Sequence, residues 1–373
     1  MDNRGAIKRV FPGNNTSQGF YSFYDHILPE DATRFFIIKG GPGVGKSTLM
    51  KKIGEAMIEM GYDTEYHHCS SDNNSLDGVV FPQIGVALID GTSPHIVDPK
   101  HPGAVDEIVY LGDYWHEEGV RQCRTEIMEA NREVSICFER AYRFLRAAQV
   151  VYDDWEAVVG EGMDFARANQ LADELIRELF GSMRVASRAG SVRRLFASAI
   201  TPDGMMNYLY SILGRCHKKY VIEGEPGTGK SVLLEKVARA ACERNHAVEL
   251  YHCPLNPSKI EHVIIPGLST ALTKSIEPHT YTPSKGDTII DMNQCLSYDF
   301  LKAYPGRIAT NSELFDRLFG HAISFIGQAK RAHDRMERYY IANMDFGRIE
   351  KLREQLLERI LRYAREVELK AVD

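Results

Sequence analysis

Two glycine-rich stretches decide the fold of this 373-residue chain: Gly40-Gly41-Pro42-Gly43-Val44-Gly45-Lys46-Ser47, called glycine loop 1, and Gly224-Glu225-Pro226-Gly227-Thr228-Gly229-Lys230-Ser231, called glycine loop 2. Both fit the pattern G-x-x-x-x-G-K-[ST]. The glycines let the backbone wrap so that successive N–H groups point inward at phosphate oxygens, and a helix that follows adds its positive N-terminal end. The pattern therefore predicts two phosphate-binding loops.

The residues around each loop indicate a strand before it and a helix after it. Apolar runs at residues 35–38 and 220–222 are typical of buried strands. The helices are predicted from Ser47 to about Met60 and from Ser231 to about Arg244. Strands alternating with helices predict the α/β class, with a mainly parallel sheet and helices on both faces. The first half has further predicted strands, with counterparts in the second half, near residues 64–68, 85–90 and 107–111.

The two halves of the chain are related in sequence, which predicts two copies of one fold. The two loops begin 184 residues apart, at positions 40 and 224, and this offset aligns residues 40–95 with 224–279 without a gap. Identical residues occupy 19 of those 56 positions, which is too many for chance. A second block, near the end of each half, recurs at an offset of 181. We therefore expect two tandem domains, residues 1–188 and 189–373.

The last third of each half is predicted to be helical. Residues 118–159 and 313–342 contain no proline and almost no glycine, and their apolar residues recur at helical spacing. A break is followed in each half by a second predicted helix, about 164–180 and 346–368. Each domain should thus end in an antiparallel helical hairpin. The hairpins, about 118–186 and 313–370, either pack on the sheet or on each other, or project as an arm that binds a protein partner.

These loops resemble those of the P-loop NTPase superfamily. The pairs His68-Cys69 and His252-Cys253 after the second strand, and Pro94-His95 and Pro278-His279 after the third, are also similar to a bacterial family of duplicated P-loop ATPases. The resemblance covers the core of both halves. It implies two P-loop NTPase domains that bind ATP with Mg²⁺ and hydrolyse it, as is usual in the superfamily. The implied nucleotide contacts extend one residue past each motif, to Thr48 and Val232.

Within such a site each residue type has a role. Lys46 and Lys230 would reach the β- and γ-phosphates, and the hydroxyls of Ser47 and Ser231 would complete a Mg²⁺ shell. A second acid, usually an aspartate that ends an apolar strand, organises the metal and the attacking water.

Only the first half supplies that acid at the expected place. Asp90 ends the run Val86-Ala87-Leu88-Ile89, whereas the aligned position in the second half is Lys274. A cation there would compete with Mg²⁺, so we expect the second site to bind nucleotide weakly or without efficient hydrolysis. The alternative is that the metal-organising acid lies elsewhere, for example at Asp106 and Asp287, which correspond to each other.

The acid that activates water is harder to place. Gly91-Thr92 follows Asp90, so the glutamate that commonly stands there is missing. Asp72 and Asp77 are candidates because they belong to the loop after the second strand, at the carboxyl end of the predicted sheet. Asp77 is matched by Glu261 but Asp72 only by Asn256, so the expected catalytic residues are Lys46, Asp90 and Asp77.

Composition and charge are those of a folded intracellular protein. Hydrophobic residues make up 44% and charged residues 26% of the chain. The seven scattered cysteines contain no C-x-x-C pair, which argues against a disulfide framework. The N-terminus has no signal-peptide pattern and no apolar run is long enough to span a membrane, so we expect a cytoplasmic protein. The halves carry −10 and +4, which favours their packing together. The net charge of −6 gives no general footprint for nucleic acid, although the +4 half leaves room for a modest basic patch.

Three functions fit these observations. The first is a Mg²⁺-dependent ATPase that hydrolyses mainly in the first half, with a regulatory or degenerate second half. The second is a small-molecule or nucleotide kinase, although no arginine-bearing lid or acceptor pocket is recognisable. The third is a nucleotide-gated switch that turns over little and moves its helices onto a partner. No N-K-x-D motif marks guanine, so ATP is preferred over GTP by default.

Overall fold

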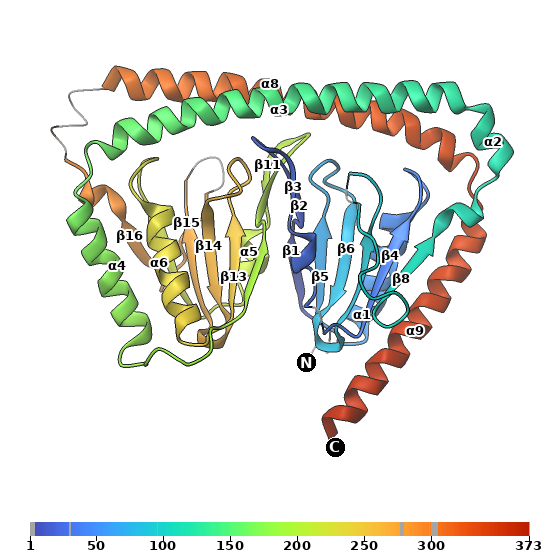
Figure 1. Ribbon diagram of the computed structural model, residues 1–373, viewed down its shortest axis with the longest axis horizontal. Helices are drawn as coiled ribbons and strands as arrows, with labels where there is room; N and C mark the ends of the chain where they lie inside the picture. Colours follow the sequence, from blue (N-terminus) through green and yellow to red (C-terminus); the bar gives the residue numbers. More distant parts are fainter. Residues whose placement is uncertain are drawn as a thin grey trace. The chain divides into compact units, whose positions relative to one another are not determined.

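The computed structural model describes residues 4–29, 31–94, 96–276, 280–297, 299 and 305–372 (Figure 1). Contacts divide the chain into two compact units. Unit 1 comprises Met1–Gly13, Ser22–Glu139 and Phe325–Asp373, and unit 2 comprises Asn14–Tyr21 and Arg140–Ser324. The units therefore differ from the two sequence repeats, because each combines residues from both halves. His95, Pro278 and His279, which contributed to the family resemblance, lie outside the described residues.

Unit 1 contains a six-stranded mixed sheet in the order β1-β5-β6-β7-β4-β8. Strand β6 is antiparallel to both of its neighbours, whereas the other three pairings are parallel. The sheet is mainly parallel, as expected, but the sequence missed β6, and this strand makes the sheet mixed. Its six strands are β1 (Ile7–Val10), β4 (Arg34–Lys39), β5 (Thr64–His68), β6 (Leu76–Phe81), β7 (Val86–Asp90) and β8 (Asp106–Tyr110).

Unit 2 contains an equivalent sheet in the order β16-β12-β15-β14-β13-β9, again with one antiparallel strand, β14. Two short ribbons, β2-β3 and β10-β11, accompany the sheets. The strands of this sheet are β9 (Val192–Leu195), β12 (Lys218–Glu223), β13 (Val248–His252), β14 (Ile260–Ile265), β15 (Thr270–Lys274) and β16 (Thr288–Asp291). The ribbon strands are β2 (Gly13–Thr16), β3 (Gly19–Ser22), β10 (Ser198–Thr201) and β11 (Gly204–Asn207).

The helices after the glycine loops lie where the sequence predicts them. Their first turns follow Gly45 and Gly229, whose φ angles of 91° and 80° are in the left-handed region that glycine tolerates best. The α-helices are α1 (Lys46–Glu59), α2 (Glu117–Gln122), α3 (Arg124–Gly160), α4 (Phe165–Phe180), α5 (Leu209–Leu213), α6 (Lys230–Glu243), α8 (Pro305–Ile341) and α9 (Phe346–Val372). Short 3₁₀ turns are η1 (Tyr24–His26), η2 (Pro82–Ile84), η3 (Leu111–Tyr114), η4 (Pro266–Leu268) and η5 (Met292–Cys295).

The last helix of each repeat packs in the core of the other repeat's sheet. In unit 1, Leu356 and Ile360 of α9 are fully buried in one apolar cluster with α1, β4 and β7. In unit 2, Ala172 and Leu175 of α4 are buried in the cluster that contains α6 and β12. Burial of an apolar helix stripe on a sheet is what stabilises both layers. The exchange is reciprocal, because Leu175 and Leu356 correspond at the offset of 181.

The backbone repeats this exchange at the start of each helix. The Asp345 N–H donates to the Tyr114 carbonyl at 2.9 Å in unit 1. The corresponding Asp164 N–H donates to the Cys295 carbonyl at 2.7 Å in unit 2. These two bonds join equivalent positions, so the same docking geometry occurs in both units.

The predicted hairpins within each repeat are therefore not what forms, although their helices are. Figure 1 shows α4 turning away from α3, and α9 turning away from α8. In unit 2 the long helices α3 and α8 instead lie side by side and antiparallel: Phe144 contacts His321, with ring centroids 5.1 Å apart, and Asp154 accepts a bond from Asn311 at 2.7 Å. In unit 1 the two helices are joined by an ion pair between Glu133 and Arg335.

Candidate functional site

Glycine loop 1 joins β4 to α1, next to the end of β7. Ile38 pairs with Asp90 in the parallel register, which brings the end of β7 beside the loop. The Lys46 ammonium donates to the carbonyls of Gly40 at 3.0 Å and Gly41 at 2.8 Å. Its Nζ lies 3.4 Å from Oδ2 of Asp90. The structure thus brings together the lysine and the acid that the sequence singled out.

Hydrogen bonds fix the surroundings of this pair. The Thr92 hydroxyl donates to the Gly40 carbonyl at 3.0 Å, and the Thr92 N–H donates to Oδ1 of Asp90 at 2.9 Å. The Ser47 hydroxyl oxygen accepts the N–H of Leu76 at 2.9 Å. Thr92 therefore links glycine loop 1 to Asp90.

Asp77 lies beside Asp90 but is buried. It is on β6, one residue before Gly78, which pairs with Ile89 in the antiparallel register. Its carboxyl interacts with the Tyr24 hydroxyl and the Cys69 thiol, and burial together with Asp77 raises the pKa of both groups. Only 3% of Asp77 is exposed. Asp77 is thus a buried neighbour of Asp90, and its role as the water-activating acid stays a prediction.

The alternative metal acids lie at the wrong edge of the sheets. Asp106 begins β8 and pairs with Phe35 near the start of β4, away from glycine loop 1. Its Oδ2 accepts the N–H groups of Lys100 and His101. Asp287 similarly precedes β16, whose Thr288 pairs with Tyr220 before the middle of β12. These two aspartates therefore hold loops at the amino ends of parallel strands.

The end of α8 lies directly over glycine loop 1, which sequence reasoning missed. A Cβ built on Gly41 would be 2.7 Å from the Tyr340 ring. One built on Gly43, whose φ is +69°, would be 3.0 Å from the carbonyl oxygen of Glu337. Gly41 and Gly43 thus need to lack a side chain because α8 approaches the loop closely.

The same helix brings a group of titratable side chains to the loop. One ligand atom from each of His333, Asp334 and Glu337 lies within 4.8 Å of the other two, so this set could hold a cation. Lys330, one turn earlier, pairs with Asp334 and also lies 3.5 Å from Asp72. The only sequence signal for these residues is that Asp334 and Glu337 recur as Asp153 and Glu156 at the offset of 181.

Glycine loop 2 has the same lysine-to-carbonyl hydrogen bonds as loop 1 but different charges. The Lys230 ammonium donates to the carbonyls of Gly224 and Glu225, both at 2.6 Å. Ile222 pairs with Lys274 just as Ile38 pairs with Asp90, so Lys274 lies where the acid of loop 1 lies. Burial and the nearby Lys274 lower the pKa of Lys230 to about 7.

Lys274 also contacts a hydroxyl and a buried acid. Its Nζ donates to Oγ of Ser231 at 3.3 Å and lies 3.9 Å from Oε1 of Glu261. Glu261 matches Asp77 of the first half. The strand pair β14-β15 therefore holds an acid and a lysine where β6-β7 holds two acids.

The long helix α3 lies over glycine loop 2 as α8 lies over loop 1. A Cβ built on Gly227 would be 2.3 Å from the Glu156 carbonyl oxygen, and the Glu156 carboxylate pairs with Lys259. Glu156 corresponds to Glu337. Both loops are thus approached by a glutamate-bearing helix from the other repeat.

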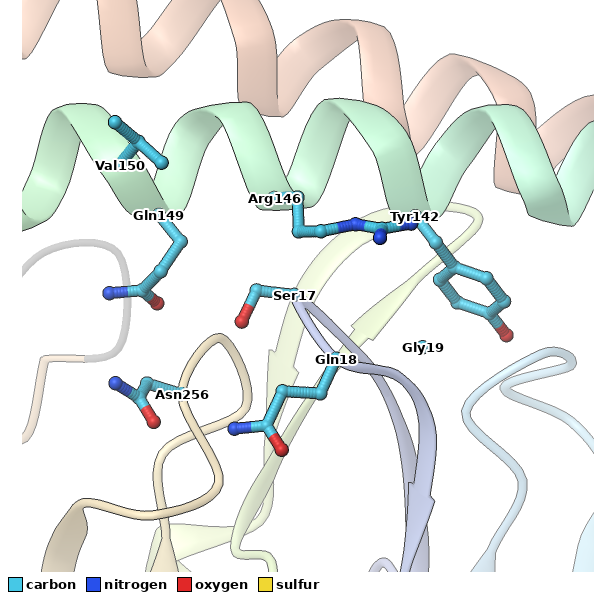
Figure 2. Close-up of a pocket in the computed structure, with 8 residues that line it drawn as sticks. All are labelled: Ser17, Gln18, Gly19, Tyr142, Arg146, Gln149, Val150 and Asn256. Atoms are coloured by element: carbon cyan, nitrogen blue, oxygen red, sulfur yellow. The ribbon is translucent and has the colours of Figure 1, made fainter.

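A pocket of about 410 Å³ opens in unit 2 between the segment Ser17–Gly19 and α3. Figure 2 shows the side chain of Gln149 pointing toward Asn256 across this pocket, with Arg146 extending above Ser17. Gln149 and Asn256 correspond to Lys330 and Asp72, which form an ion pair at loop 1. The second site thus has neutral amides where the first has charges.

Comparison with protein-family models, with curated proteins and with solved structures found no match to this chain. Within the described part of the chain, no helix is both long enough and apolar enough to cross a membrane.

Proposed function

We propose that this protein is a Mg²⁺-dependent ATPase built from two P-loop NTPase domains, with turnover mainly at glycine loop 1. The observation that carries the proposal is the difference in charge at equivalent positions. Asp90 lies 3.4 Å from Lys46 at loop 1, whereas Lys274 lies 3.3 Å from the Ser231 hydroxyl at loop 2. Loop 2 is then a nucleotide site with little turnover that regulates the first.

The residues at loop 1 have the chemistry that Mg²⁺ prefers. The Ser47 hydroxyl and the Asp90 carboxylate are hard oxygen donors at the mouth of the loop, and they would hold the ion. Bound there, Mg²⁺ would neutralise charge that develops on the transferring phosphate.

The protein's own groups account for the remaining steps. The backbone N–H groups of residues 43–47 would bind the phosphates, and Lys46 would exchange its two loop carbonyls for phosphate oxygens. We assign the acid that orients the attacking water to Glu337, because α8 brings it to Gly43 while Asp77 is buried beside Tyr24.

Phosphate release by single-lysine variants tests this proposal. Lys46→Ala should abolish release of phosphate from ATP without any added acceptor, and Lys230→Ala should keep most of it. Equal losses from the two variants would contradict the asymmetry. Release that requires an acceptor would instead identify a kinase, and tight binding without release would identify a switch. The same assay with GTP determines the base preference.

A further inference from the structure

The Lys274 side chain reaches the hydroxyl of Ser231 from the strand position that Asp90 holds at loop 1. Lys274 is the last residue of β15, next to β12, and only 8% of it is exposed. Its ammonium donates to the Ser231 hydroxyl at 3.3 Å, and Ser231 is the counterpart of the serine proposed to ligate Mg²⁺. A cation is therefore already present beside that hydroxyl as part of the chain.

The two sites also balance in formal charge. At loop 1, a lysine, an aspartate and one Mg²⁺ would carry +2 together, and at loop 2 the two lysines carry +2 once both are protonated. The buried acids Asp77 and Glu261 add the same charge to each site. Loop 2 thus offers a polyphosphate the same positive charge without a metal.

The charges at glycine loop 2 favour the binding of an anion. Lys230 and Lys274 are both buried, and the nearby ammonium of Lys274 disfavours the charge of Lys230. The acids facing them are Glu261, the exposed Glu225 and Glu156, and Glu156 is already paired with Lys259. Bringing phosphate oxygens between the two ammonium groups would relieve this repulsion.

We infer that Lys274 takes the place of Mg²⁺, so that glycine loop 2 binds nucleoside di- or triphosphate without a metal ion. This inference rests on the proposed function, since it takes both loops as nucleotide sites. An ammonium group can donate hydrogen bonds to β- and γ-phosphate oxygens, but it cannot order water ligands as Mg²⁺ does. Loop 2 would therefore stay occupied when loop 1 loses its metal, and would hydrolyse little.

Binding titrations on the full chain test the inference. Lys46→Ala leaves loop 2 as the binding site, and Lys230→Ala leaves loop 1. A non-hydrolysable ATP analogue is titrated into each, first with Mg²⁺ and then with excess EDTA. We expect EDTA to weaken binding to the Lys230→Ala variant about tenfold or more, and to change the Lys46→Ala variant by about twofold or less.

A second substitution examines Lys274 itself. In the Lys46→Ala background, Lys274→Asp should make binding depend on Mg²⁺, and Lys274→Met should weaken it about tenfold in either buffer. Lys274→Arg, which keeps the charge, controls for folding together with the thermal unfolding midpoint of each variant. Mg²⁺-dependent binding by the Lys46→Ala variant, or unchanged affinity after Lys274→Met, would overturn the inference.

Failure of the inference differs from failure of the proposed function. If the Lys46→Ala, Lys230→Ala double variant binds as much analogue as the native protein, neither loop is the nucleotide site and the proposed function fails. If the double variant does not bind and the Lys46→Ala variant binds only with Mg²⁺, the proposed function stands and the role of Lys274 is wrong.

Discussion

The exchange of the last helices predicts that a substitution in one repeat destabilises the unit containing the other repeat's sheet. Leu356 of α9 belongs to the second repeat but is 1% exposed in the core of unit 1. Leu175 of α4 belongs to the first repeat and is 4% exposed in the core of unit 2. Leu356→Ala and Leu175→Ala are therefore a matched pair.

The expected loss follows from the burial of each leucine. Removing a fully buried leucine side chain costs about 3 kcal/mol, the lost transfer free energy plus the cavity that remains. For a unit of this size each kcal/mol lowers the unfolding midpoint by about 2–4 °C. The affected unit should thus unfold on the order of 10 °C earlier, and the other unit should change much less.

The two tryptophans of the chain make the assay specific. Trp115 packs against the core of unit 1, and Trp155 is part of unit 2. Trp155→Phe leaves a fluorescence reporter of unit 1, and Trp115→Phe leaves a reporter of unit 2. Leu356→Ala should shift the Trp115 transition and Leu175→Ala the Trp155 transition. The opposite pairing, or equal shifts of both reporters by both variants, would refute the exchange.

Three further predictions concern the loops. If Glu337 orients the attacking water, Glu337→Gln should lower the rate of phosphate release by about 10²-fold or more. Glu156→Gln, the matched change at loop 2, should lower that rate by about twofold or less. Equal effects of the two variants in a steady-state assay would contradict the assignment. Because the pKa of Lys230 is lowered to about 7 and a bound phosphate would keep its ammonium charged, loop 2 must take up a proton on binding above pH 7. The affinity of the Lys46→Ala variant should therefore fall about tenfold per pH unit above 7, and a flat profile between pH 7 and 9 would be inconsistent with this. In denaturant titrations, Gly43→Ala should reduce the free energy of unfolding by about 1 kcal/mol or more beyond the reduction caused by Gly103→Ala. Both glycines have a positive φ, but only Gly43 faces α8. An equal loss of unfolding free energy in the two variants would show that α8 does not press on the loop.

The local signals of the sequence predicted the elements around each loop well. The glycine loops, the helices after them and the strands ending at His68 and Asp90 all lie within one or two residues of their predicted places. Strand β6 was missed because Leu76–Phe81 is buried on both faces and shows no alternation, so it resembles part of a loop after β5. Its antiparallel insertion makes the sheet mixed.

The exchange of helices could not be predicted from one sequence. The apolar stripe of α9 fits a sheet of this fold, and the chain contains two such sheets with similar faces. Periodicity shows that a helix is buried on one side, but it does not say which copy of the sheet covers it. Only the contacts of the folded chain resolve that choice.

The sequence predicted the site residues that residue type and the repeat offset identify. It did not predict those that reach the site through the exchange of helices between the repeats. Lys46, Asp90 and the substitution of Lys274 for the acid follow from the pattern and the repeat offset. Glu337 does not, because a glutamate on a long helix is usually part of a solvated face. It becomes a site residue only because α8 approaches Gly43.

The most direct measurement is the number of nucleotides that one chain binds. Equilibrium dialysis with a non-hydrolysable ATP analogue and Mg²⁺ should give two per chain for the native protein and one for Lys46→Ala or Lys230→Ala. It should give none for the double variant. A double variant that binds as many as the native protein, or a native protein that binds none, would contradict the assignment of the two glycine loops as nucleotide sites.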